Sequence, residues 1–142
     1  LLGLCVMAAG GWWIITEPGI ELPHDTKEIS PDVAGWRRER LPRLPRKEPI
    51  RVVPDWVCEI VSPRTGRLDR SCKMPVYARE GVEHLWLVDP LSRTLEVYRR
   101  EAGRWVVVVV HAGAARVRAT PFEALELELS RWWLESAGAP AG

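Results

Sequence analysis

The stretch that decides the fold of this chain is residues 53–63, which read VPDWVCEIVSP. It combines β-branched and aromatic residues with a proline near each end, which is typical of a strand whose pairing stops at both ends. Because side chains alternate along a strand, Trp56, Cys58 and Ile60 share one purely apolar face. The opposite face places Glu59 among valines, where burial is expected. A buried carboxylate is costly unless it is paired or bound to a metal, so Glu59 is the residue that the fold must accommodate.

Length and composition indicate one domain. The chain has 142 residues, 46% of them hydrophobic, which is enough for one compact core and too little for two. We expect a single domain over residues 1–142 with a disordered tail at residues 137–142. The formal net charge of +1 excludes a global field that attracts nucleic acid or membranes. Three cysteines without metal-ligand spacing indicate a reducing compartment, and we expect a cytoplasmic protein.

The uncharged stretch at residues 1–15 raises the question of a signal peptide or a membrane span. It lacks a positive amino-terminal segment and is too short to cross a bilayer, so we expect neither and no membrane partner. The stretch runs directly into the first expected strand, and we expect that an amino-terminal part of the domain is missing.

The pattern of the chain predicts several further elements. A helix is expected from about Ser71 to Gly81, since Asp69 and Ser71 are good N-caps and Gly81 is a typical stop. Pro75 fits only the first turn of that helix, unless it kinks it. Residues 24–27 are expected to form a polar turn. Strands are expected at residues 11–18, 20–22, 84–88, 94–99, 104–110 and 115–119, with a hairpin turn at residues 101–103.

Residues 37–51 change character, and we call them the basic loop. Three prolines interrupt any helix there. The segment is either a solvated connection or an arm that contacts phosphates. Its basic residues are Arg37, Arg38, Arg40, Arg43, Arg46, Lys47 and Arg51, set against Glu39 and Glu48.

Three residues from successive elements could do chemistry together: Asp32, Glu59 and Lys73. Two carboxylates on adjacent strands suit Mg²⁺, which prefers oxygen ligands and keeps several waters. Such an ion stabilises the charge that develops on a phosphodiester and lowers the pKa of an attacking water. A lysine ammonium beside it can position that water or neutralise the phosphate. The set therefore predicts hydrolysis of a nucleic-acid backbone.

Asp55 is a rival for Asp32 as the second carboxylate. It lies four residues before Glu59 on the same strand face, about 13 Å away, which is too far to share one ion. We therefore prefer Asp32 as the ligand and interpret Asp55 as a turn or supporting group. The three histidines are scattered, and Ser62 precedes a proline without any sign of a base, so we interpret these residues as surface or packing groups.

Several spaced motifs occur in the same order as in a known family. They are residues 54–63, Asp69-Arg70 with Lys73, residues 77–82 (YAREGV), residues 86–90 (WLVDP) and residues 94–98 (TLEVY). Over about residues 12–134 the chain thereby resembles the Uma-two family of restriction endonuclease-like proteins, which is placed in the PD-(D/E)xK nuclease superfamily. The resemblance implies an α+β fold whose core is a mixed β-sheet flanked by helices.

The resemblance also implies roles for single residues. Asp32 in Pro31-Asp32 matches the first metal-binding aspartate of the family, and Glu59 matches the glutamate of the ExK element. Val61 stands where that element has its lysine, so Lys73 would supply the amine from the following helix. Family members begin with a helix and a Tyr-Glu-Leu-like segment, which residues 1–10 do not match. We therefore expect a domain that lacks its amino-terminal helix.

Two functional hypotheses follow. The first is an endonuclease in which Asp32 and Glu59 bind Mg²⁺ or Mn²⁺, Lys73 assists, and DNA is the substrate. It predicts that basic residues flank the carboxylates, and that the protein forms a homodimer to cut both strands. The alternative is a catalytically inactive, truncated domain of the same fold that binds nucleic acid or a protein partner. The residues predicted to contact nucleic acid are Arg37, Arg38, Arg40, Arg64, Arg67 and Arg70.

Overall fold

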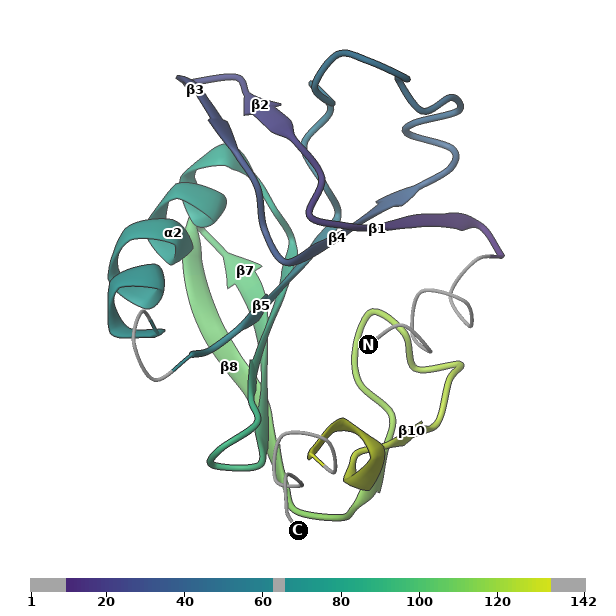
Figure 1. Cartoon of the computed structure of the whole chain (residues 1–142), viewed down its shortest axis with the longest axis vertical. Coiled ribbons are helices and arrows are strands. Elements are labelled where there is room, and N and C mark those ends of the chain that lie inside the picture. Colours follow the sequence, from purple (N-terminus) through teal and green to yellow (C-terminus); the bar gives the residue numbers. More distant parts are fainter. Residues whose placement is uncertain (1–9, 63–65, 134–142) are drawn as a thin grey trace, which may run out of the picture.

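The protein is built on a six-stranded sheet with the strand order β1-β4-β5-β6-β7-β8 (Figure 1). A computed structural model describes residues 10–62 and 66–133. The strands of this sheet are β1 (Trp12–Thr16), β4 (Val33–Arg37), β5 (Trp56–Ile60), β6 (His84–Asp89), β7 (Thr94–Glu101) and β8 (Arg104–Ala112). Two strand pairs lie outside it: β2 (Ile20–Leu22) with β3 (Asp25–Ile29), and β9 (Arg116–Val117) with β10 (Leu127–Glu128). The helix α2 spans Gly66–Glu80.

The mixed character of the sheet comes from β5, the strand in the stretch that opened the sequence analysis. It pairs antiparallel with β4 and parallel with β6, and the other neighbouring pairs are antiparallel. Parallel neighbours need a crossover connection, and α2 supplies it between β5 and β6. The predicted α+β fold with a mixed sheet is confirmed.

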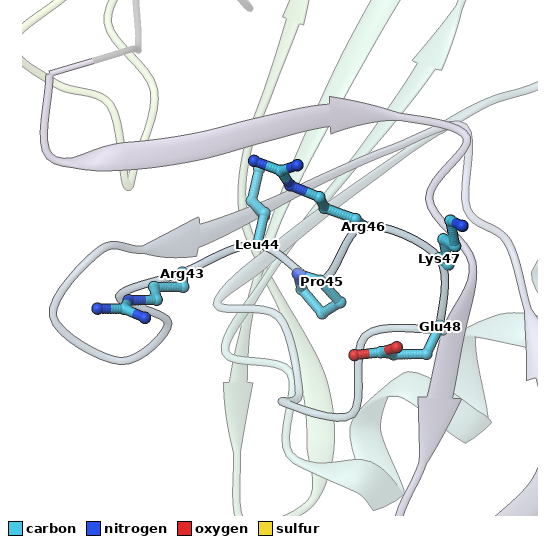
Figure 2. Close-up of a pocket in the computed structure, with 6 residues that line it drawn as sticks. All are labelled: Arg43, Leu44, Pro45, Arg46, Lys47 and Glu48. Carbon is cyan, nitrogen blue, oxygen red and sulfur yellow. The ribbon is translucent and has the colours of Figure 1, made fainter.

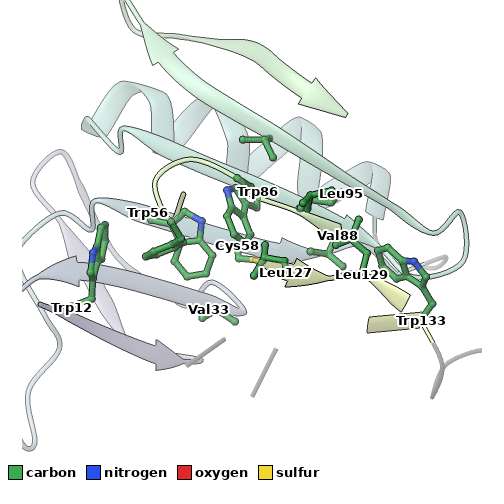
Figure 3. Close-up of a cluster of buried hydrophobic side chains, with 14 residues drawn as sticks. Trp12, Val33, Trp56, Cys58, Trp86, Val88, Leu95, Leu127, Leu129 and Trp133 are labelled. Carbon is green, nitrogen blue, oxygen red and sulfur yellow. The ribbon is translucent and has the colours of Figure 1, made fainter. Parts of the chain in front are cut away.

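The two faces of the sheet carry separate hydrophobic clusters. Trp56 and Cys58 point into the cluster that the carboxyl-terminal segment with β9 and β10 covers, as Figure 3 shows. Val57, between them, points into the cluster that includes Tyr77 of α2. Figure 1 accordingly shows α2 on one side of the sheet and β10 on the other. The alternation predicted for β5 is therefore confirmed.

Aromatic residues fill the first of these clusters. The rings of Trp56, Trp86 and Phe122 meet edge to face, with centroids 5.0–5.6 Å apart. This spacing lies in the range in which aromatic quadrupoles attract one another. The indole N–H of Trp86 donates to the Thr120 carbonyl at 2.7 Å, so the ring is buried without leaving its donor unpaired.

The further strands predicted from the pattern begin and end within two residues of the observed strands, whereas the predicted turn and the predicted start of the helix are wrong. The turn expected at residues 24–27 is shorter, because β3 begins at Asp25. The helix begins at Gly66 rather than near Ser71, so Pro75 lies inside it. Pro75 has no N–H to donate to the preceding turn, but it faces solvent and the helix continues past it. The predicted end is correct: Gly81 has a φ of 97°, and the next N–H donates to the Tyr77 carbonyl at 3.0 Å.

The tail expected at residues 137–142 and the stretch at residues 1–9 lie outside the described residues. Within the part of the chain that the structure describes, no helix is long and apolar enough to cross a bilayer.

Gly35 in β4 gives a test of how tightly the sheet is packed. A Cβ at this position would lie 2.8 Å from Ile14 Cδ1 and 3.1–3.2 Å from carbons of Trp56 and Trp12. We expect Gly35→Ala to destabilise the protein by about 1–3 kcal/mol, because a packed core resists added volume. Urea unfolding followed by tryptophan fluorescence measures this change. Gly10→Ala is the control, since a Cβ there meets no atom within 4 Å, and equal stability of the two variants would contradict the prediction.

Candidate active site

Asp32 and Glu59 brace each other where β4 begins and β5 ends. The antiparallel register sets Val33 opposite Cys58, which brings the residue before β4 beside Glu59. The Asp32 N–H donates to Glu59 Oε1 at 2.9 Å, and the Ile60 N–H donates to Asp32 Oδ2 at 2.6 Å. Each carboxylate is thus held by a backbone donor of the other strand. Their positions follow from strand pairing rather than from flexible side chains.

Lys73 reaches the same carboxylate from the helix. Its ammonium Nζ lies 3.1 Å from Glu59 Oε2, and its side chain is 29% exposed. The Glu59 side chain is 4% exposed. Burial raises the pKa of Glu59, although the Asp32 N–H and the Lys73 ammonium act in the opposite direction. The site therefore contains a buried carboxylate, Glu59, whose charged form is only partly stabilised, and a partly exposed ammonium, Lys73, beside it.

The donor set fits a hard divalent cation. Among the described residues, no group of three or more His, Cys, Asp or Glu side chains gathers into a ready metal site. Mg²⁺ does not need one, because it is commonly held by one or two carboxylates together with waters and substrate phosphates. Asp32 and Glu59 provide carboxylates of this kind side by side. A zinc-type site with three or four protein ligands does not fit this set.

Asp55 lies at the other end of β5. Its Oδ2 accepts the Arg37 N–H at 2.8 Å, and its Oδ1 lies 2.8 Å from a guanidinium nitrogen of Arg40. The residue is 8% exposed, so this pairing compensates a buried charge. The structure does not bring Asp55 to Glu59.

The structure does not bring three of the predicted arginines to the carboxylates either. Arg37 and Arg38 stack on the rings of Trp12 and Trp13, with the guanidinium carbons 4.6 and 4.2 Å from the ring centroids. Arg40 is tied to Asp55 at the same end of the sheet. These side chains are occupied in cation–π and ion-pair contacts at the end of β4 and β5 remote from Glu59.

The other arginines predicted to contact nucleic acid come after β5 in the sequence. Arg64 lies outside the described residues, and Arg67 and Arg70 belong to the first half of α2, where only the backbone is described. Their contact with nucleic acid stays a prediction.

The sequence did not predict the backbone donors of the site. The N–H groups of Asp32 and Ile60 hold the carboxylates, yet every residue except proline carries such a group and no residue type marks it. The clamp between Arg40 and Asp55 was also missed. The sequence signal for that clamp is weak: a single acidic residue, Asp55, follows the arginine-rich basic loop.

Comparison with known proteins agrees with this fold. A mixed sheet with one crossover helix is consistent with a restriction endonuclease-like fold. The model of the Uma2 (Uma-two) family, described as "Putative restriction endonuclease", matches residues 2–131, and the chain belongs to this family.

Solved structures give the same fold. The chain is similar to the crystal structure of a "putative nuclease belonging to DUF820" from Anabaena variabilis, with a TM-score of 0.69 and 23% identity. The match covers 93% of this chain and 73% of that one. No curated protein matches the chain.

The raised pKa of Glu59 makes a prediction for pH dependence. The pKa is higher in the folded protein than the ordinary value of 4.5, so ionisation costs stability in the native state. This cost is absent well below pH 4.5, grows as the pH rises from 4.5 to the raised pKa, and stays constant above it. We expect the stability of the wild type, relative to Glu59→Gln, to improve as the pH falls from 7 towards 4.5. Urea unfolding of both proteins in EDTA measures the difference, and a difference independent of pH would contradict the prediction.

Proposed function

We propose that the protein is a metal-dependent endonuclease that hydrolyses phosphodiester bonds of DNA. The observation that carries this proposal is the meeting of Asp32, Glu59 and Lys73 from two strands and the crossover helix. Membership of the Uma2 family supports it. The three residues are far apart in the sequence. Packing of a hydrophobic core does not require such a group of charged side chains, and neither does the solubility of the surface.

Asp32 and Glu59 would hold the cation, Mg²⁺ or Mn²⁺. When bound, such an ion neutralises charge on the phosphate and lowers the pKa of the attacking water. The backbone donors from Asp32 and Ile60 keep the two carboxylates in place, so little reorganisation is needed at the moment of reaction. Lys73, with 29% of its side chain exposed, can turn its ammonium to a phosphate oxygen or to the water. In this proposal it takes the place of the lysine that Val61 replaces.

A second candidate function has one observation in its favour. Both oxygens of Glu59 already accept protein donors, namely the Asp32 N–H and the Lys73 ammonium. A cation and Lys73 would therefore compete for the same carboxylate. If Lys73 prevails at cellular Mg²⁺ concentrations, the protein is an inactive domain of the nuclease fold that binds nucleic acid or a protein partner without cutting.

Cleavage of supercoiled plasmid distinguishes the two functions. We expect nicking by the wild type in Mg²⁺ or Mn²⁺, complete loss in EDTA, and a loss of at least about 100-fold in Glu59→Gln and in Asp32→Asn, which remove charge from the cation site. Glu80→Gln is the matched control. Glu80 is also buried and lies near a histidine, His24, but at the far end of α2, about 10 Å along the helix from Lys73.

Circular dichroism first establishes that all variants are folded. Nicking that survives in Glu59→Gln at the wild-type rate would refute the assigned site. A folded wild type that never nicks DNA would favour the inactive domain.

A further inference from the structure

The basic loop divides into two groups of positive residues. Four of its seven are occupied within the protein: Arg37 and Arg38 stack on tryptophans, Arg40 pairs with Asp55, and Arg51 lies 3.5 Å from a carboxylate oxygen of Glu21. The members of this group lie where the loop joins the sheet. These contacts fix the side chains against the protein, and a ligand that bound these arginines would have to displace or share the contacts, so they are poorer candidates for a ligand.

The other three basic residues are Arg43, Arg46 and Lys47. All three are exposed, and within residues 10–62 and 66–133 none makes a side-chain hydrogen bond, an ion pair or a ring contact. They line a surface pocket of about 560 Å³ together with Leu44, Pro45 and Glu48, and Figure 2 shows the three cationic side chains extending away from the backbone of the loop. Glu48 makes no salt bridge to any of them, so their positive charge is available to a partner.

The backbone that carries these charges is anchored on both sides. The Trp13 indole N–H donates to the Leu41 carbonyl at 2.8 Å, and the Trp36 indole N–H donates to the Val52 carbonyl at 2.7 Å. Ile50 donates its N–H to the Gly19 carbonyl at 2.9 Å and is itself buried. Prolines at positions 42, 45 and 49 restrict the segment between these anchors. An anchored segment loses less entropy when it binds a partner than a free one.

We propose that Arg43, Arg46 and Lys47 form a contact surface for the phosphate backbone of duplex DNA. This assignment rests on the proposed function. It replaces Arg37, Arg38 and Arg40, which the sequence predicted as phosphate contacts, with residues at the tip of the loop. These three cations have no partners within the protein and are spread over five residues of an anchored loop. A polyanion, which carries charges at regular intervals, can neutralise all three at once. An isolated phosphate group would instead need donors that converge on one point.

The position of the loop sets the size of the partner. β4 and β5 are antiparallel, so the loop that joins them lies at the end of these strands opposite to Asp32 and Glu59. Figure 1 shows the loop beyond β4, while the carboxyl end of β5 points away from it. Asp55, which pairs with Arg40 of the loop, is four residues from Glu59, about 13 Å along the strand. At 3.4 Å per base pair, a duplex that touches both must extend about four base pairs or more beyond the scissile bond.

Salt dependence of DNA binding tests the assignment independently of cleavage. We would measure fluorescence anisotropy of a labelled 20-base-pair duplex in EDTA, from 50 to 200 mM salt, with the full chain carrying Glu59→Gln. Each lost phosphate contact lowers the slope of log K against log salt by about 0.9. The variant Arg43→Gln/Arg46→Gln/Lys47→Gln is therefore expected to lower this slope by about 2.7 and to weaken binding at least tenfold at 50 mM salt.

The matched control is Arg93→Gln/Arg104→Gln/Arg118→Gln, which removes the same charge from exposed positions outside the basic loop. It is expected to change the slope by less than about 1.

Four outcomes would overturn the assignment: an unchanged slope in the loop variant, equal effects of the two triple variants, no duplex binding, or binding to anionic vesicles or single-stranded RNA that exceeds binding to the duplex. The nuclease proposal fails separately. If the wild type never cleaves DNA but its duplex binding depends on the loop, the nuclease proposal is refuted and the loop assignment stands. If the wild type cleaves DNA but the salt slope does not depend on the loop, the loop assignment is refuted and the nuclease proposal stands.

Discussion

The burial of one carboxylate constrains the rest of this structure. Glu59 is 3% exposed on a strand whose neighbours are apolar, and an ionised group in such a place needs donors. It finds two, the Asp32 N–H from the start of β4 and the Lys73 ammonium from α2. Strand pairing on one side and helix docking on the other must therefore both be correct before Glu59 can be buried. The same two requirements bring together the residues of the candidate site, so the burial of Glu59 links the fold to the site.

The tryptophans link the basic loop to the sheet. Trp12 and Trp13 on the edge strand β1 each carry an arginine from the end of β4 or just beyond it on their ring faces. The indole N–H of Trp13 also fixes the loop backbone at Leu41. A guanidinium on an indole face keeps its charge while the ring shields it on one side. Arginines that look alike in sequence thus serve different purposes, because the tryptophans engage those nearest to the strands and leave those at the tip of the loop exposed.

The sequence predicted what depends on local pattern. The alternation of residues 53–63 gave β5 and its two faces, and Gly81 gave the end of the helix, because both follow from side-chain periodicity and backbone preference. The predicted start of the helix was wrong because Pro75 was assumed to lie in the first turn. The packing of α2 on the sheet stabilises the helix on both sides of this proline. The order of the expected elements, two strands and then a helix, led to Asp32 and Lys73 as partners of Glu59, and the resemblance to a family implied the same set. Long-range contacts such as Arg40 with Asp55, and backbone donors such as Ile60, leave no mark in the sequence.

The origin of the amine has a consequence for the site. Val61 remains in the sheet, with its N–H donating to the Val88 carbonyl at 2.7 Å, so the strand continues past Glu59 without a cation of its own. The ammonium comes from α2 instead, and α2 is held against the sheet by donors from β7 and β8. The Arg100 guanidinium donates to the Ala78 carbonyl at 2.7 Å, and the Trp105 indole N–H donates to the Met74 carbonyl, next to Lys73, at 2.8 Å. Strands that carry none of the candidate catalytic residues thereby set the distance between Lys73 and Glu59. A lysine on β5 would be placed by its own strand, whereas Lys73 is placed by how the helix docks, and the charge balance of the site depends on that docking.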